Sequence, residues 1–328
     1  MPLVSWIIPV LNGMPYLPAM LESLHAQTSR DFEVLVWDNG SSDGSLDVLR
    51  AWIPSKLPGR LFTGRPLSLG NSLRRLVEES SSPFCARIDA DDISEPHRLE
   101  VQLKFLQEHR ELALVGSERT SIDTCGLHIP RRSKFPSEPH DILHATLRAP
   151  RLLHPGVLFR KSAVVEVGNY QDHSTPEIPY WSEDYDLWLR LLTKHSVAAL
   201  PDALLRYRFN PQGVSESAMR LNQTTIAKRQ AWISRAPAFA GIASEDLAAR
   251  LWDRKLLLAW PTLIRIAQHF ETRDGIPTTT RLRIPSFRNT VSTFVRREDL
   301  ITRAMLRFYA ARPTVKWRSP YFSHLTGR

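Results

Sequence analysis

The sequence predicts an α/β protein built on a mostly parallel sheet with helices on both faces. Over residues 4–109, short apolar runs of strand length alternate with amphipathic segments of helix length. Several of these runs are apolar throughout, as in central parallel strands that are buried on both faces. Polar, turn-forming residues follow three of the runs. Strand–helix–strand units of this length imply right-handed crossovers and therefore a parallel sheet.

Each predicted element rests on its own pattern. The run 4–11 is almost continuously apolar, and an Asn-Gly pair breaks it. Apolar residues at helical spacing then predict a helix over 15–27. The same reasoning predicts strands over 32–37, 61–63, 84–88, 112–117, 197–200 and 204–209, a hairpin over 121–129, and helices over 46–53, 68–80, 96–109, 141–147 and 183–192.

Length and charge indicate two parts. With 328 residues and 42% hydrophobic content, the chain is long enough to bury a core. Residues 218–328 hold 20 Lys and Arg against 7 Asp and Glu, a charge of +13, whereas residues 1–217 carry −4. We expect an α/β domain over 1–217 and a basic, mainly helical region over 218–328. Two cysteines are too few for a disulfide framework or a zinc site.

The basic region raises the question of a partner. The amino terminus lacks the pattern of a signal peptide, and no apolar stretch approaches the roughly 20 residues of a membrane span, so we expect a cytoplasmic protein. The apolar run 256–264, which Pro261 interrupts, is either an ordinary core helix or an interfacial helix on an anionic membrane surface. The region has no recognisable nucleic-acid-binding module, so we expect no nucleic-acid partner.

Three carboxylates follow the apolar run 84–88 within four residues. If the backbone stays extended, Asp89 and Asp91 share one face and lie about 7 Å apart. Carboxylate oxygens together with phosphate oxygens suit Mg²⁺ or Mn²⁺. The alternative is a solvated acidic loop that caps the helix near Pro96, and this capping role is the one we expect for Asp92.

Two further sets of polar residues are candidates for the same site. Asn12 and Asp38 also follow apolar runs, and the carboxyl ends of parallel strands meet at one crevice, where ligands bind. Glu183 and Asp184 open a predicted helix, where acids either cap the helix or serve a site. No glycine-rich dinucleotide motif or P-loop follows any strand, which disfavours a dehydrogenase or a P-loop phosphotransferase.

Taken in order, the motifs resemble those of glycosyltransferase family 2, a family of inverting enzymes with the GT-A fold. The matching segments are IPVLNG at 8–13, VWDNGSSDGS at 36–45, RIDADD at 87–92, HPG at 154–156, GNY at 168–170 and EDYDLW at 183–188. Each segment is a weak signal alone, but their shared order makes the resemblance specific. It covers residues 3–217 and implies a mixed, mostly parallel sheet flanked by helices, with a C-terminal helical appendage.

The resemblance implies a role for each polar residue of these motifs. Asp38 would hydrogen-bond the nucleotide base, and Asp89 would lie near the ribose or the sugar. Asp91, with Asp89, would bind the Mg²⁺ or Mn²⁺ that carries the donor diphosphate and neutralises the leaving group. The implied nucleotide-sugar site comprises Pro9, Asn12, Asp38, Asn39, Arg87 and Asp89.

On the acceptor side, the resemblance assigns Asp184 as the catalytic base that takes a proton from the attacking hydroxyl. Glu183 would support the acceptor or the base, and His154 and Asn210 would contact the acceptor or the phosphates. Two residues depart from the family pattern: many relatives have a second Asp at the position of Asn39, and a His at that of Asn210.

The resemblance therefore implies a metal-dependent hexosyltransferase. It would move a sugar from a nucleoside-diphosphate sugar to a hydroxyl of a glycan or lipid-linked acceptor, in the synthesis of cell-surface polysaccharide or lipopolysaccharide. Such a protein would be cytoplasmic or peripheral at the inner face of the plasma membrane. The alternative is a catalytically degenerate scaffold or regulatory protein that still binds nucleotide. Intact Asp89, Asp91 and Asp184 argue against that alternative.

Overall fold

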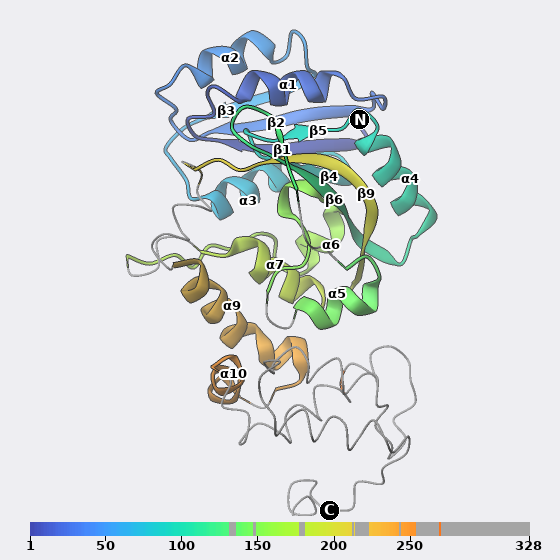
Figure 1. Cartoon of the computed structure of the whole chain (residues 1–328), viewed down its shortest axis with the longest axis vertical. Helices are drawn as coiled ribbons and strands as arrows, with labels where there is room; N and C mark the ends of the chain where they lie inside the picture. The colour runs from blue at the N-terminus through green and yellow to red at the C-terminus, as the bar shows by residue number, and fades with distance from the viewer. Residues whose placement is uncertain are drawn as a thin grey trace, which may run out of the picture. The chain divides into compact units, whose positions relative to one another are not determined.

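The fold is a mixed sheet with helices on both faces. The computed structural model describes residues 1–130, 136–146, 149–176, 181–211, 213, 223–242, 244–253 and 269. Within these residues nine strands form one sheet (Figure 1), in the order β3-β2-β1-β4-β8-β6-β9-β5, with β7 paired to β6. The α/β class with a mixed sheet flanked by helices is thus confirmed; among the described residues, four strand pairs are parallel and four are antiparallel.

Most predicted elements are present, with ends shifted by a few residues. The strands are β1 Val4–Val10, β2 Phe32–Asp38, β3 Gly59–Thr63, β4 Phe84–Arg87, β5 Ile93–Ser94, β6 Leu112–Ile122, β7 His128–Ile129, β8 Leu158–Arg160 and β9 Ser196–Arg208. The helices are α1 Leu17–His25, α2 Ser45–Trp52, α3 Leu69–Glu79, α4 Arg98–Glu108, α5 Pro139–Thr146, α6 Lys161–Glu166, α7 Glu183–Leu191, α9 Gln223–Ala240 and α10 Glu245–Trp252, with a 3₁₀ turn η1 at His154–Gly156.

The amino-terminal half of the sheet is parallel, and this arrangement brings the predicted site loops to one edge. β1 pairs in parallel with β2 and with β4, and β2 pairs in parallel with β3. Val10 lies opposite Asp38, and Ile7 lies opposite Arg87. The loops that follow β1, β2 and β4 therefore leave the sheet at the same edge.

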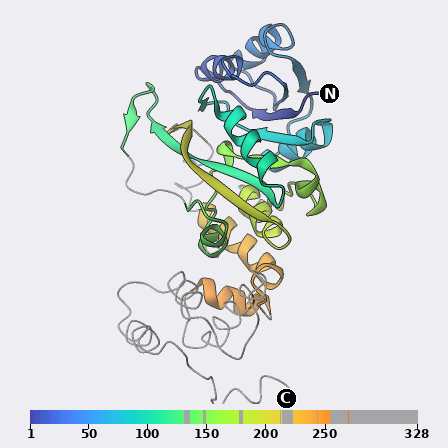
Figure 2. The same cartoon turned by 90° about the vertical axis from the view of Figure 1, so that its right-hand side faces the viewer.

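The other half of the sheet departs from the prediction at β9. The strands predicted over 197–200 and 204–209 are one strand, Ser196–Arg208, which runs parallel to β6. Figure 2 shows the two strands side by side. The Pro201-Asp202 pair looks like a break in the sequence, but it falls where the register shifts, and a bulge tolerates proline. β6 likewise extends beyond 117 to Ile122, and its hairpin with β7 is confirmed.

Two layers of helices cover the sheet. The apolar sides of α1, α2 and α4 pack on the face that carries Val4, Trp6 and Ile8, all fully buried. Helix α3 lies on the opposite face (Figure 1). Burial of both faces explains why β1 is apolar along its whole length.

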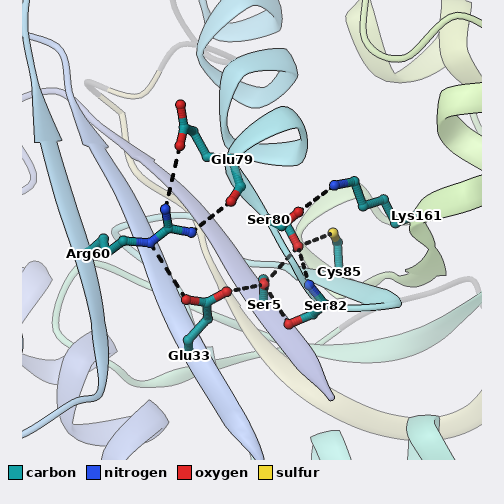
Figure 3. A network of polar contacts seen from close by, with 8 residues as sticks. All are labelled: Ser5, Glu33, Arg60, Glu79, Ser80, Ser82, Cys85 and Lys161. Atoms are coloured by element: carbon teal, nitrogen blue, oxygen red, sulfur yellow. Dashed lines mark hydrogen bonds and ion pairs between the residues drawn. The ribbon is translucent and has the colours of Figure 1, made fainter. Parts of the chain in front are cut away.

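A polar network closes the amino-terminal edge of the sheet, away from the loops described above. Ser5 Oγ donates to Glu33 Oε1 over 2.9 Å, and Ser80 Oγ donates to Ser5 Oγ over 2.8 Å (Figure 3). Lys161 Nζ donates to the Ser80 carbonyl, and Cys85 contacts the same residue's hydroxyl. Burial raises the pKa of the Cys85 thiol to about 12, so we interpret this network as structural.

The chain divides into two units, Met1–Ala231 and Trp232–Arg328, so the division falls within α9. Trp232 is fully buried, its indole N–H donates to the Ala248 carbonyl over 3.2 Å, and its ring contacts Phe239 and Trp252. This tryptophan packs in a helical core. Within the described residues, every helix is too short or too polar to cross a membrane. The predicted apolar run 256–264 lies outside the described residues.

Candidate active site

The loops after β1 and β2 are joined by hydrogen bonds. Asn12, in a left-handed conformation with φ 52°, accepts from the Ser42 N–H at 2.9 Å, and its own N–H donates to Ser41 Oγ at 2.9 Å. A Cβ on Gly13 would lie 3.3 Å from the Cβ of Ala90, in the acidic motif. The side-chain oxygen of Asn12 thus holds the loop after β2 in place.

Asp38 ends β2 with one carboxylate oxygen available. The residue is 2% exposed. Its Oδ2 accepts from the N–H groups of Gly40 and Ser41, at 3.1 and 3.2 Å. Its Oδ1 is buried and has no hydrogen-bond partner among the described residues. A buried, unpaired acceptor is costly, so a donor group on a ligand would be stabilised here. Pro9, buried in β1 opposite Trp37, offers the site only shape.

Asn39 points its amide into the protein. Its Oδ1 accepts from Trp37 Nε1 at 3.1 Å and from the Leu67 N–H at 2.9 Å, and its Nδ2 donates to Ser72 Oγ at 3.0 Å. The side chain therefore ties β2 to α3 and to the loop between β3 and α3. Asn39 was predicted for the nucleotide site, but its side-chain amide bonds to the protein and holds the surrounding loops in place.

The three acids after β4 converge. The backbone forms a turn here, with the Asp92 N–H donating to the Asp89 carbonyl at 3.3 Å. The extended backbone on which the predicted spacing of about 7 Å depended is therefore not present. One carboxylate oxygen from each of Asp89, Asp91 and Asp92 lies within 4.8 Å of the others. We expected Asp92 to cap the following helix, and this prediction is wrong. Its Oδ1 accepts from the Arg208 N–H at 2.8 Å, and the residue that precedes α4 is His97.

The electrostatics of this acidic cluster (Asp89, Asp91 and Asp92) favour a cation. Burial and the neighbouring Asp89 charge raise the pKa of Asp91 above its ordinary value. The pKa of Asp92 is raised well above its ordinary value by burial and by both other acids. Three crowded oxygen ligands fit Mg²⁺ or Mn²⁺, which take hard oxygen ligands and need few of them from the protein. The residues present therefore fit the predicted metal.

Arg87 connects the acidic cluster to the groups around Glu183. Its side chain is 2% exposed and forms an ion pair with Asp89. Burial alone would lower the pKa of Arg87, but the Asp89 carboxylate raises it above its ordinary value. The guanidinium also interacts electrostatically with Tyr170 and Glu183, so one buried cation lies between the two groups of acids.

Glu183 and His154 face each other beside Tyr170 and Trp188. His154 Nδ1 lies 3.7 Å from Glu183 Oε1, and His154 Nε2 lies 2.9 Å from the Tyr170 hydroxyl. Burial and the Arg87 charge hold the pKa of His154 well below its ordinary value. Burial and the Asp184 charge raise the pKa of Glu183 to about 8. At neutral pH both groups are therefore mainly uncharged.

Asp184 is oriented by its own helix. Its Oδ1 accepts from Ser182 Oγ at 3.2 Å and from the Tyr185 N–H at 2.6 Å. Its Oδ2 has no partner among the described residues, and the side chain is only partly buried. One oxygen is thus fixed while the other remains available, which suits a general base.

Asn210, two residues after the end of β9, contacts the acidic cluster. Its Nδ2 donates to Asp91 Oδ2 over 3.0 Å. An amide that donates in this way holds the carboxylate in place. The structure places Asn210 beside the acidic residues, whereas the resemblance implied a contact with the acceptor or the phosphates.

Three residues near the site were not predicted. Tyr170 stands in a motif that was noted, but its contact with His154 is not visible in the sequence. Arg208 contacts Asp91 and Asp92. Arg98 looks like an exposed helical charge, yet it is fully buried and donates to the Arg87 carbonyl at 2.8 Å. Burial lowers the pKa of Arg98 to about 9.

Solved structures share this fold. Staphylococcus aureus TarS 1–349, solved in complex with UDP-GlcNAc, aligns with a TM-score of 0.58 at 15% identity, covering 94% of this chain and 91% of that one. The mannosyltransferase PcManGT from Pyrobaculum calidifontis, solved with GDP-Man and Mn²⁺, aligns with a TM-score of 0.56 at 15% identity, covering 94% and 80%. The GT-A fold is therefore confirmed.

Sequence relatives place the chain in a family. The amylovoran biosynthesis glycosyltransferase AmsE of Erwinia amylovora is 35% identical over 191 residues, which make up 57% of this chain and 68% of that protein. The family model for glycosyl transferase family 2 matches residues 5–168, a span that contains the loop after β2, the acidic cluster and His154. With this match and with the site geometry described above, the chain belongs to glycosyltransferase family 2 and is a glycosyltransferase.

Proposed function

We propose that this glycosyltransferase is a metal-dependent inverting enzyme that uses a nucleoside-diphosphate sugar. The observation that carries the proposal is the convergence of the carboxylates of Asp89, Asp91 and Asp92 within 4.8 Å of one another. They lie at the edge of the sheet where Asp38 keeps an unpaired buried oxygen. PcManGT, which shares the fold, was solved with a nucleotide sugar and Mn²⁺.

The donor half of the site would use two kinds of group. Asp38 Oδ1 would accept a hydrogen bond from the nucleotide base, and the loops held by Asn12 and Asn39 would shape the surroundings of that base. Asp91 and Asp89 would hold Mg²⁺ or Mn²⁺, which when bound neutralises charge on the donor diphosphate. Arg87, buried beside Asp89, would fix the orientation of that carboxylate.

The acceptor half would use Asp184 as general base. Its Oδ2 would take the proton of an acceptor hydroxyl while that oxygen forms a bond to the anomeric carbon. The bond from the anomeric carbon to the diphosphate oxygen breaks with its electron pair, on the opposite face of the sugar. Attack from the face opposite the leaving group inverts the anomeric configuration. Glu183 and His154, both mainly neutral, would line the acceptor side without competing for the proton.

A donor panel tests the reaction. The purified chain is incubated with UDP-, GDP- and dTDP-sugars and Mn²⁺, and slow donor hydrolysis is followed with and without EDTA. We expect one donor class to be consumed and EDTA to stop the reaction. Turnover that persists in EDTA would refute metal dependence, and donor binding without turnover would favour the scaffold alternative.

A matched pair of variants tests the base. Asp184→Asn should lower kcat by about 10²–10⁴-fold while leaving donor affinity near the wild-type value, because a general base acts only on the acceptor proton. Asp47→Asn, on the exposed face of α2, is the control and should change neither value. If donor affinity falls together with kcat, Asp184 supports the fold rather than the chemistry.

We further propose that residues 1–217 form the catalytic domain and that residues 218–328 hold the protein at a membrane where a glycan or lipid-linked acceptor is extended. The charge of +13 in residues 218–328 supports this, as does a relative named for amylovoran biosynthesis. Flotation of the full chain with anionic and with neutral vesicles tests it. Equal indifference to both vesicle types would refute a membrane role for this region.

A further inference from the structure

Arg208, the last residue of β9, connects the acidic cluster to two other loops. The residue is 6% exposed. Its Nε donates to the backbone carbonyl of Asp91 at 2.8 Å, and its Nη1 donates to the carbonyls of Asp123 and Thr124, at 2.8 and 3.3 Å, in the β6–β7 turn. The guanidinium also lies 4.5 Å from the ring centre of Tyr16, just before α1. One side chain therefore joins three segments that are far apart in the sequence.

The end of β9 holds the acids through several atoms. The Arg208 N–H donates to Asp92 Oδ1 at 2.8 Å, and Asn210 donates to Asp91 Oδ2 at 3.0 Å. With the bond from Arg208 Nε, the backbone of Asp91 is fixed from β9, and its side chain is fixed from the segment just after it. The backbone N–H would survive any substitution except proline, so a change at Arg208 removes the bond to the Asp91 carbonyl and leaves the one to Asp92.

Among the described residues, the Arg208 guanidinium donates to carbonyl oxygens and forms no ion pair with an acid. Its observed contacts therefore fix the positions of backbone groups. Mg²⁺ demands near-ideal octahedral geometry and tolerates little displacement of its ligands. Groups that orient metal ligands from behind typically contribute about 10–100-fold to metal affinity.

We propose that Arg208 is a positioning residue that presents Asp91 to the metal and couples its placement to the β6–β7 turn. This inference rests on the metal dependence proposed above. Lysine cannot replace arginine here, because a single ammonium has no planar fork to reach the Asp91 carbonyl and the turn carbonyls while its stem packs on Tyr16.

Binding of Mn²⁺ to the full chain, measured by the EPR signal of free Mn²⁺ in the presence of UDP or GDP, tests the proposal without any need for turnover. Arg208→Lys and Arg208→Met should each weaken Mn²⁺ binding about 10-fold or more. Arg206→Met is the matched control: the residue lies two positions earlier on β9, is half exposed and pairs with Glu95 at 2.7 Å. This control should bind Mn²⁺ like the wild type.

The melting temperature of each metal-free variant is measured on the same samples. If the Arg208 variants melt too early to be assayed, Tyr16→Leu, which removes only the ring beneath the guanidinium, should still weaken Mn²⁺ binding about 2–5-fold. Folded Arg208 variants, or a Tyr16→Leu variant, that bind Mn²⁺ like the wild type would overturn the inference.

Asp91→Asn separates this inference from the proposed function. If the wild type binds Mn²⁺ and Asp91→Asn does not, the site is a metal site, and the Arg208 variants alone decide the positioning role. If the wild type itself binds no Mn²⁺ with either nucleotide, the metal dependence fails and the inference falls with it.

Discussion

Glu183→Gln should change how the stability of this protein depends on pH. The Glu183 side chain is 12% exposed at the start of α7 and lies beside the charge of Asp184. Burial and that charge raise its pKa from 4.5 to about 8. Glutamine has the shape of the neutral carboxyl and cannot ionise. At pH 6 the variant should therefore resemble the wild type in packing.

The sign and size of this change in stability with pH follow from proton linkage. The folded-state pKa lies above the unfolded-state value, so the stability that Glu183 contributes is fully present below pH 4.5 and is lost as the pH rises toward 8. Integrating the difference in bound protons between pH 6 and pH 9 gives a loss of roughly 3 kcal/mol for the wild type. The variant lacks this loss, and titrating groups that do not interact with Glu183 cancel in the comparison.

Urea denaturation without metal or nucleotide, followed by tryptophan fluorescence at pH 6, 7.5 and 9, measures the effect. The free energy of unfolding of Glu183→Gln minus that of the wild type should rise by roughly 3 kcal/mol across this range. Glu78→Gln, an exposed residue of α3, should show no such rise. A difference that stays constant with pH would refute the raised pKa and the neutral state of Glu183.

Substitutions at three other positions test local packing by the same denaturation assay. Asn39→Ala removes three hydrogen bonds and should lower the free energy of unfolding by about 2–3 kcal/mol. Asn39→Asp should cost less, because its oxygens still accept from Trp37 and Leu67, and the Ser72 hydroxyl can donate to it by leaving the Ser68 carbonyl; equal costs would contradict this. Tyr170→Phe leaves His154 Nε2 without its partner at 2.9 Å and should cost about 1–3 kcal/mol; a neutral result would show that the contact contributes nothing. Gly59→Ala should cost more than about 3 kcal/mol, because its Cβ would lie 2.0 Å from the Val34 carbonyl oxygen; wild-type stability would disprove the close approach.

The match between sequence and structure is best where a local pattern decides the element. β1 is apolar along its length because it is buried on both faces, and its partners β2 and β4 were predicted from the same signal. The two-residue strand β5 was missed because a segment that short carries no periodicity. β9 was divided in two at Pro201, because whether a proline breaks a strand or sits in a bulge depends on the neighbouring strand.

For the candidate site, the sequence by itself determined which residue types are present and at which strand ends they stand. The turn that gathers Asp89, Asp91 and Asp92, the inward amide of Asn39 and the burial of Arg98 and Arg208 were decided only by the tertiary structure. The physical reason is how far apart in the sequence the interacting groups lie. Strand and helix patterns arise from neighbours along the chain, whereas the pKa of Glu183 and the contacts of Arg208 depend on groups far away in the sequence that only folding brings together.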